Sequence, residues 1–209
     1  MVVKRLPVYL RVLNELKDEA VDIVSSHELA RRTGFSSEQI RKDLACFGAL
    51  GTRGLGYRTD VLRERIRSVL GLDRTLNVVL VGAGNLGTAL ARYTLSRETG
   101  INLVAVFDDD PEKVGRRIED VEIRAMADLA GVLAEQGVRV AILAVPASAA
   151  QGVTDLLVAG GVEAILNFSP AKLDGRGKAY VKNIDLAIEL QSLAYYASGE
   201  AGRAGTSGA

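Results

Sequence analysis

A glycine-rich loop is the part of the sequence whose residue types and spacing point most directly to chemistry. The apolar run 78–81 leads into G-x-G-x-x-G, and a helix-forming stretch follows. In that context the first glycine makes a tight turn, the second lets the backbone approach a pyrophosphate, and the third lets helix and strand pack closely. Free N–H groups at the helix N-terminus favour phosphate. We therefore predict a dinucleotide site at Gly82, Ala83, Gly84, Asn85, Leu86 and Gly87.

An acidic residue at the expected distance completes this motif. Asp108 lies 21 residues after Gly87 and ends the apolar run that follows the helix. Its carboxylate can accept hydrogen bonds from both hydroxyls of an adenosine ribose, and it would repel a 2′-phosphate. Asp109 and Asp110 follow it, with no arginine directly after. The stretch therefore predicts a preference for NAD(H) over NADP(H).

Residues that would use such a cofactor for turnover are not evident. The single histidine, His27, lies far from the glycine loop. A Tyr-x-x-x-Lys pair is missing, because Tyr93 is followed four residues later by Arg97, and Tyr180 by Ile184. A dehydrogenase needs a proton donor or acceptor beside the nicotinamide, and the chain leaves little room for a substrate domain. We expect a nucleotide sensor with no catalytic residues.

The elements around the loop indicate an α/β domain at 76–184. Short β-branched apolar runs occur at 77–81, 102–108, 139–146 and 164–168, and each is typical of a strand buried in a parallel sheet. Helical stretches separate them at about 85–97, 126–136 and 147–159, which predicts a doubly wound domain. We expect another helix at about 185–197 and a disordered tail at 198–209.

The first 75 residues predict a different module. Apolar positions between Val8 and Leu16 indicate a first helix. Ser25 and Ser36 each open a capping signal, and Gly34 separates the two short helices that follow, which is the pattern of a helix-turn-helix. Glycines within 48–57 predict a hairpin, as in a winged helix, and a further helix is expected at 60–70. We place the domain boundary near Thr75.

A winged helix-turn-helix implies double-stranded DNA as a partner. The N-terminal part of its second helix reads base edges in the major groove, and an arginine on a glycine-rich wing can enter a narrow minor groove. Arginine and lysine can also touch phosphate, which positions the protein without specifying sequence. The DNA-contacting candidates are Ser36, Ser37, Glu38, Gln39, Arg41 and Lys42 on the helix, and Arg53 with Gly54 on the wing.

Composition supports two modules in one soluble chain. Net charge is zero, but residues 1–75 hold 14 Lys and Arg against 10 Asp and Glu, and the remainder holds 12 against 16. Cys46 is the single cysteine, which excludes an internal disulfide and a cysteine-based metal cluster. No apolar run reaches the roughly 18 residues of a membrane span, and the N-terminus is not a signal peptide. We expect a cytoplasmic protein with neither membrane nor metal.

From about Leu6 to Tyr196 the sequence resembles the Rex family of redox-sensing transcriptional repressors. The matching pieces are YLRVLNEL at 9–16, SSHELA at 25–30, QIRKDLACFGALGTRGLGY at 39–57, VGAGNLGTAL at 81–90, FDDDPEKVG at 107–115 and ILNFSP at 165–170. The resemblance implies a winged helix, a Rossmann-like domain and a domain-swapped helix 185–197. It also implies a homodimer that binds an inverted-repeat operator when NAD⁺ prevails and leaves it when NADH binds.

The resemblance also implies roles for single positions. Arg11 resembles an arginine that pairs with an aspartate of the partner subunit, Asp185 resembles that aspartate, and Tyr93 resembles its alternative partner in the NADH state. Two loops resemble those that pass the cofactor, and they contribute Val145, Pro146, Asn167, Phe168, Ser169 and Pro170. Leu186 departs from the family, where an aromatic residue can shield the nicotinamide, so the strength of NADH discrimination is open.

Two alternatives remain open at this point. The first is a small NAD(P)-dependent oxidoreductase with an accessory N-terminal domain, which turnover of a hydroxy acid or aldehyde would reveal. The second is a CoA-binding module, because similar sheets bind CoA. Asp108 argues against CoA, since a ribose 3′-phosphate would meet its carboxylate.

Overall fold

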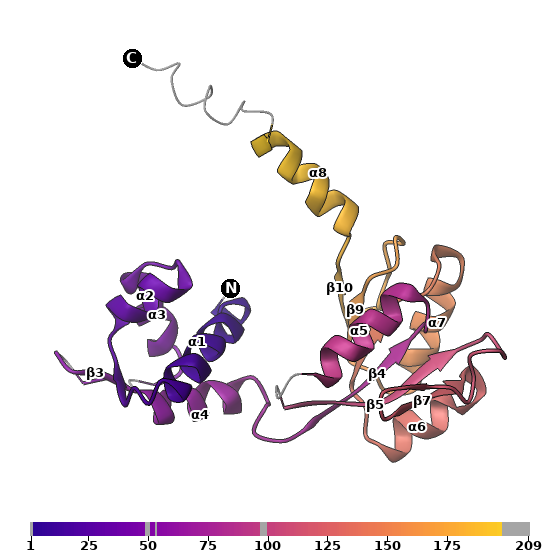
Figure 1. Ribbon diagram of the computed structural model, residues 1–209, viewed down its shortest axis with the longest axis horizontal. Coiled ribbons are helices and arrows are strands. Elements are labelled where there is room, and N and C mark those ends of the chain that lie inside the picture. The colour runs from indigo at the N-terminus through magenta and orange to yellow at the C-terminus, as the bar shows by residue number, and fades with distance from the viewer. Residues whose placement is uncertain (1, 49–50, 53, 97–99, 198–209) are drawn as a thin grey trace. The chain divides into compact units, whose positions relative to one another are not determined.

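The computed structural model describes residues 2–48, 51–52, 54–96 and 100–197. The chain divides into two compact units, Met1–Thr75 and Leu76–Ala209 (Figure 1). The boundary falls where the sequence pattern changes from helical to β-branched. Within the described residues, the helices are too short or too polar to cross a membrane. The predicted tail at 198–209 lies outside the described residues.

The first unit consists of helices and a small antiparallel sheet of order β1-β3-β2. Its elements are η1 (Val2–Lys4), α1 (Leu6–Asp18), β1 (Ile23–Val24), α2 (Ser26–Thr33), α3 (Ser37–Ala45), β2 (Gly51–Thr52), β3 (Gly56–Arg58) and α4 (Thr59–Val69). The predicted helices and hairpin are confirmed. The strand β1 escaped prediction, because two residues carry no readable alternation.

Serine caps position the two short helices as predicted. The Ser25 Oγ accepts a hydrogen bond from the Glu28 N–H at 3.0 Å, and the Ser36 Oγ accepts one from the Gln39 N–H at 3.1 Å. Gly34 ends α2 with a φ of 77°, a left-handed conformation that suits glycine. The Glu28 carboxylate binds Arg31 and Arg32. The Glu28 side chain therefore pairs with arginines of α2, while its backbone N–H is the group that Ser25 caps.

The second unit is built on a parallel sheet with one antiparallel edge. Among the described residues its strand order is β10-β9-β8-β4-β5-β7-β6, and only β6 and β7 pair antiparallel. The strands are β4 (Leu76–Val81), β5 (Ile101–Asp108), β6 (Arg117–Ile118), β7 (Val121–Ala125), β8 (Val140–Leu143), β9 (Ala164–Asn167) and β10 (Tyr180–Asn183). The sequence pattern revealed β4, β5, β8 and β9. It did not reveal β6, β7 and β10, whose charged residues interrupt the apolar runs.

Helices cover both faces of this sheet, which makes the domain doubly wound as predicted. The helices α6 (Leu129–Glu135), α7 (Ala147–Ala159) and α5 (Asn85–Leu95) are separated by strands along the chain. Side chains of α6 and α7 share one apolar cluster with Val79 and Phe107, whereas Ala91 of α5 shares another with Leu80 and Val106. Alternate residues of β4 thus serve opposite faces, as a pleated strand requires.

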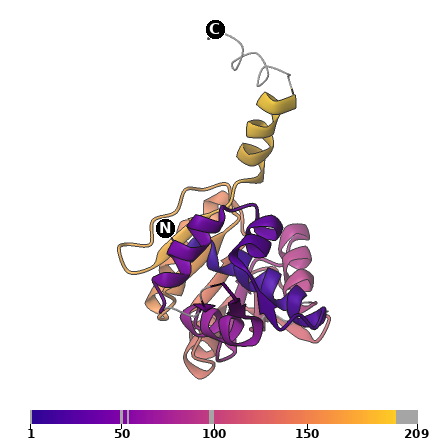
Figure 2. The same ribbon diagram turned by 90° about the vertical axis from the view of Figure 1, so that its left-hand side faces the viewer.

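The last described helix, α8 (Leu186–Ala197), is the yellow helix of Figures 1 and 2. It begins one residue after the predicted start because Asp185 acts as its cap, with the carboxylate accepting from the N–H groups of Ala187 and Ile188. Its large apolar side chains are exposed, among them Leu186, Ile188, Leu190, Leu193 and Tyr196. This exposure leaves α8 without the apolar burial that usually stabilises a helix of this length.

Candidate functional site: a nucleotide cleft and a DNA-contacting face

A cleft lies where parallel sheets usually bind ligands. The chain leaves β4 toward β5 on one side and later returns to β8 on the other, so the strand order reverses between β4 and β8. Ligands of such sheets bind outside the carboxyl ends of the strands at this reversal. A cleft of about 450 Å³ occurs there, which is within the usual range for a small-molecule site.

Residues that follow five neighbouring strands line this cleft, Met126 after β7 among them. The β4 end contributes the glycine loop, the β5 end contributes acidic residues, and the β8 and β9 ends contribute mostly apolar ones. The lining includes Gly82, Gly84, Asn85, Leu86, Asp108, Asp109, Lys113, Met126, Val145, Pro146, Phe168 and Pro170. Most of the predicted cofactor residues are therefore brought together by the fold.

The glycine loop has the backbone geometry that its spacing predicts. Gly82 has a φ of 104°, and a Cβ there would overlap the Ala144 carbonyl oxygen. A Cβ on Gly87 would overlap the Gly82 carbonyl oxygen, whereas one on Gly84 would meet nothing within 4 Å. Gly82 and Gly87 are thus required by the protein itself, and Gly84 leaves open space on the cleft side.

Asp108 is tied into the loop more firmly than the motif indicates. It is 6% exposed. Its carboxylate accepts from the N–H groups of Ala83 at 2.6 Å and Asp110 at 2.9 Å. Burial alone would raise the pKa of Asp108, but these backbone hydrogen bonds and Lys113 outweigh it and lower the pKa below its usual value. Asp108 is therefore ionised at neutral pH and keeps lone pairs for a ligand.

Lys113 is a charged residue of this site that sequence reasoning missed. Its ammonium group lies 3.3 Å from the nearer Asp108 carboxylate oxygen and 3.4 Å from that of Asp110. The hydrogen bond to Asp108 raises the pKa of Lys113. A search for an arginine directly after Asp108 could not find it, because the turn at 109–113 folds position 113 back to the carboxylate.

The two predicted cofactor loops differ in how they contribute. Val145 and Pro146 line the cleft, as do Phe168 and Pro170. Asn167 is completely buried and Ser169 is 5% exposed, and neither is among the residues that line the cleft. Contact of Asn167 with cofactor stays a prediction, although its burial favours a role in shaping the loop.

The predicted switch residues lie on α1, on α5 and at the start of α8. The Arg11 Nε lies 4.0 Å from a Glu15 carboxylate oxygen on α1, and Asp185 caps α8. Tyr93 lies on α5 and is 57% exposed, outside the cleft lining. Leu186 is 54% exposed at the start of α8. Their pairing between subunits stays a prediction.

The outer face of α3 presents part of the predicted DNA-contacting set. Glu38, Arg41 and Lys42 are exposed, with Lys42 paired to Glu38 at 2.8 Å. The Ser36 hydroxyl caps the helix, and Ser37 is half-buried in its first turn. Cations on the exposed face of such a helix are available to phosphate or guanine.

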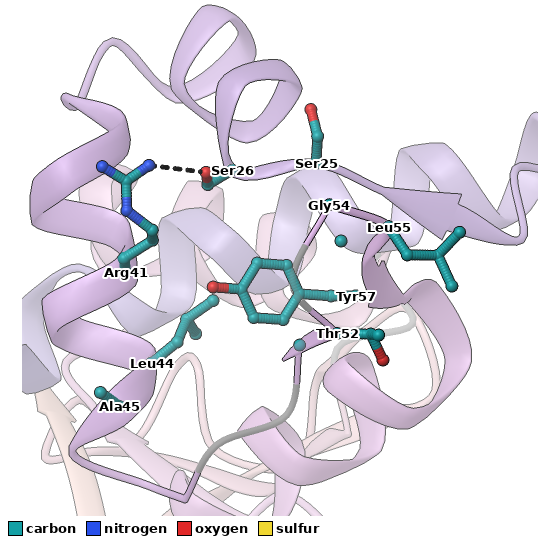
Figure 3. A pocket seen from close by; sticks show the side chains of 11 residues that line it. Ser25, Ser26, Arg41, Leu44, Ala45, Thr52, Gly54, Leu55 and Tyr57 are labelled. Atoms are coloured by element: carbon teal, nitrogen blue, oxygen red, sulfur yellow. Dashed lines mark hydrogen bonds between the residues drawn. The ribbon is translucent and has the colours of Figure 1, made fainter.

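A groove of about 570 Å³ separates α3 from the wing (Figure 3). Its lining includes Ser26, Arg41, Gly54 and Tyr57. Arg41 donates from Nη1 to the Ser26 Oγ at 3.1 Å, and Tyr57 directs its hydroxyl toward α3. Arg53 lies outside the described residues, whereas Gly54 has a φ of 83°, consistent with a tight turn at the wing.

Gln39 faces inward, toward a buried carboxylate, and not along the exposed face of α3. Its Nε2 donates to Asp43 at 2.8 Å. Asp43 also accepts two hydrogen bonds from Arg5 and one from Tyr9. With four donors around one carboxylate, this network joins α3 to α1. Base reading by Gln39 stays a prediction and would have to use the rest of its amide.

We expect acid to weaken the first unit through Asp43. The Arg5 hydrogen bonds, opposed by burial and supported by Tyr9 and Gln39, lower the pKa of Asp43 to about 2. Because the folded pKa is depressed, the stabilisation is complete above pH ~4 and is lost as pH falls through about 2. It amounts to about 2 kcal/mol. Hydrogen exchange of α1 amides between pH 5 and 2 measures it.

Asp43→Asn provides the comparison for this titration. The variant should lose about 3 kcal/mol at neutral pH because it leaves Arg5 without its anion. Its acid transition should be smaller than that of the wild type, and what remains comes from other carboxylates such as Glu28, whose pKa is also lowered to about 2. Asp18→Asn, at an exposed position near the end of α1, should behave as wild type. An unchanged acid transition in Asp43→Asn would remove Asp43 as its cause.

Family models match both units. The CoA binding domain model matches residues 73–171, and the model of a putative DNA-binding protein N-terminus matches residues 1–45. Solved structures extend the likeness to nearly the whole chain. RSP in complex with β-NAD⁺ and operator DNA is 36% identical, with a TM-score of 0.87 over 99% of this chain and 97% of that one. RSP with β-NADH is 37% identical, with a TM-score of 0.82 over 95% and 93%.

Curated relatives show the family. The redox-sensing transcriptional repressor Rex of Natranaerobius thermophilus is 50% identical over 199 residues, which is 95% of this chain and 91% of that protein. The Rex of Chloroflexus aggregans is 45% identical over 200 residues, covering 96% and 94%. Together with the helix-turn-helix unit and the glycine-loop cleft, these likenesses confirm the resemblance. The chain belongs to the Rex family of redox-sensing transcriptional repressors.

Proposed function

We propose that this protein represses transcription by binding an inverted-repeat operator, and that NADH releases it. The observation that carries the proposal is the presence in one chain of a glycine-loop cleft with Asp108 and a helix-turn-helix face with Arg41 and Lys42. The solved relative RSP supports it, since that protein is described with β-NAD⁺ and operator DNA and with β-NADH.

The cleft suggests why the reduced cofactor would be favoured. The β5 side carries Asp108 and Lys113, which suit the ribose, and the β8 and β9 side offers Val145, Phe168 and Pro170 to the nicotinamide. NAD⁺ carries a positive charge on that ring, and NADH does not. Burying a charge among apolar side chains is costly, so closure of this wall around the ring favours NADH. A ligand shifts an equilibrium only by such differential affinity.

A sensing role is also favoured over turnover. Among the described residues that line the cleft, the titratable ones are Asp108, Asp109 and Lys113, all on the β5 side. Proton transfer to a substrate beside the nicotinamide needs such a group within hydrogen-bond reach, and the β8 and β9 side offers Val145, Pro146, Phe168 and Pro170 instead. We therefore propose a cytoplasmic regulator and not an enzyme.

Titration of an operator complex tests the proposal. The operator would be selected by the full-length protein from a random duplex pool and labelled for fluorescence anisotropy. NADH should release the DNA, NAD⁺ should release it less, and CoA should have no effect. If excess NADH leaves operator binding unchanged, the proposal is overturned. Release by CoA and not by NADH would favour the CoA-binding alternative. Reduction of NAD⁺ by a hydroxy acid, or oxidation of NADH by an aldehyde, would support an oxidoreductase.

Arg41 should contribute base recognition. Arg41→Ala should weaken operator binding by about 1–3 kcal/mol and relax the preference at one base pair, as expected for a bidentate contact to guanine. Arg31→Ala, at an exposed arginine of α2 paired with Glu28, serves as control and should bind nearly as wild type. A uniform loss on all sequences with a shallower salt dependence would instead assign Arg41 to phosphate.

The exposed α8 supports a homodimer in which this helix is exchanged between subunits. Its apolar side chains need a partner surface, and a second copy of the chain would provide one. Leu190 is 68% exposed, so Leu190→Asp should give monomers in sedimentation velocity, because a buried charge opposes association. Gln191→Asp adds the same charge at a polar position and should stay dimeric. A dimer in both variants would remove α8 from the interface.

A further inference from the structure

One buried amide joins the wall of the cleft to the chain segment that directly precedes α8. Asn167 is the last residue of β9 and is completely buried. Its Nδ2 donates to the Ala171 carbonyl oxygen at 2.9 Å and lies 3.3 Å from that of Ser169, and its Oδ1 accepts from the Ser169 N–H at 2.8 Å. These bonds shape the turn that presents Phe168 and Pro170 to the cleft.

The same amide also reaches the neighbouring strand. The Asn167 Nδ2 donates to the Asn183 Oδ1 at 2.8 Å, and the Asn167 carbonyl oxygen accepts from the Ile184 N–H at 2.8 Å. Asn167 and Asn183 are register partners at the carboxyl ends of β9 and β10. Only Ile184 and Asp185 separate Asn183 from the first residue of α8.

We propose that Asn167 is the positioning residue that couples occupancy of the cleft to α8, through its hydrogen bond to Asn183. This inference rests on the proposed NADH response. A ring seated against Phe168 and Pro170 biases the position of their turn. The turn cannot move independently of the Asn167 amide, because a buried polar group that loses its partners is costly. The hydrogen bond to Asn183 couples the position of the turn to the segment that precedes α8. We assign the apolar side chains of α8 to the dimer interface.

Two substitutions at position 183 separate coupling from binding. Asn183→Ala removes the acceptor for Asn167 and leaves the bonds that shape the 168–171 turn. Asn183→Asp keeps an acceptor oxygen there, so it serves as the conservative variant. Lys182→Ala changes an exposed neighbour on β10 and serves as control. Position 183 is itself exposed, so these variants are expected to fold.

The readout is the ratio of operator dissociation constants with and without saturating NADH, measured on the full chain. Asn183→Ala should reduce this ratio by about fivefold or more, within the usual span of allosteric couplings. Its NADH affinity without DNA, followed by NADH fluorescence, should change less than about threefold. Asn183→Asp and Lys182→Ala should keep the wild-type ratio. Reciprocity requires DNA to weaken NADH binding by the same reduced factor in Asn183→Ala.

The outcomes distinguish this inference from the function on which it rests. If wild-type protein ignores NADH, the proposed function fails. If wild type responds and Asn183→Ala keeps the full ratio, the proposed function stands and the coupling role of Asn167 is overturned. Loss of NADH binding in Asn183→Ala without DNA would also overturn it, because the residue would then shape the cleft and not transmit its occupancy.

Discussion

Asp108→Ser should shift the cofactor preference from NADH toward NADPH by roughly 100-fold in the ratio of affinities. In the wild type a 2′-phosphate would meet an ionised carboxylate, and two like charges at ~4 Å repel by about 4 kcal/mol at an effective dielectric constant near 20. Serine removes that repulsion. The Lys113 ammonium, which lies 3.3 Å from Asp108 in the wild type, then remains to attract the phosphate. The change in nucleotide fluorescence on binding measures the affinities for NADH and for NADPH.

A second substitution at Lys113 tests whether the gain in NADPH affinity comes from attraction to this ammonium group or only from the lost repulsion. Asp108→Ser combined with Lys113→Ala should bind NADPH more weakly than the single variant, and NADH about equally. Serine suits this test better than arginine, because Asp108 holds the N–H groups of Ala83 and Asp110 and a short oxygen disturbs that loop less. An unchanged preference in Asp108→Ser would remove Asp108 from the ribose site.

Gly87→Ala should destabilise the second unit by more than about 3 kcal/mol and abolish NADH binding. The new Cβ would overlap the carbonyl oxygen of Gly82, so α5 could no longer approach the end of β4. Overpacking against backbone is costly because no side chain can move aside. Urea unfolding followed by circular dichroism measures the loss.

Gly84→Ala supplies the matched comparison on the same loop. Nothing in the protein lies within 4 Å of a Cβ there, and its φ of −74° suits alanine. Its stability should therefore change by less than about 1 kcal/mol, whereas NADH affinity should fall more than about tenfold, because the Cβ occupies the space assigned to the pyrophosphate. Equal effects of the two substitutions would contradict the division of roles between these glycines.

Prediction from sequence succeeded where local chemistry decides the structure. Ser25 and Ser36 begin their helices, and Gly34 ends one, through contacts within a few residues. The strands β4, β5, β8 and β9 are continuous apolar runs because both faces of the sheet are covered. The strand β1 was missed because two residues leave no local pattern, and β7 was missed because Glu122 and Arg124 interrupt its apolar run.

Side-chain direction was the part of the site that sequence could not predict. Gln39 and Arg41 are neighbours in the motif, but the turn of the helix directs Gln39 to Asp43 and Arg41 to the outer face. Asn167 and Phe168 adjoin in the predicted cofactor loop, yet one is buried in hydrogen bonds and the other lines the cleft. Both contacts are local, but distant elements hold them in place: Arg5 and Tyr9 also bind Asp43, and Asn183 also binds Asn167.

The sequence alone therefore determined the two modules, the glycine loop with Asp108 and the family likeness, because these depend on residue type, spacing and backbone conformation. Only the tertiary structure decided that Asn167 joins the cleft wall to the segment before α8, and that Asp43 ties α3 to α1. These pairings arise where the fold brings separate chain segments within hydrogen-bond distance, and no local pattern encodes that approach.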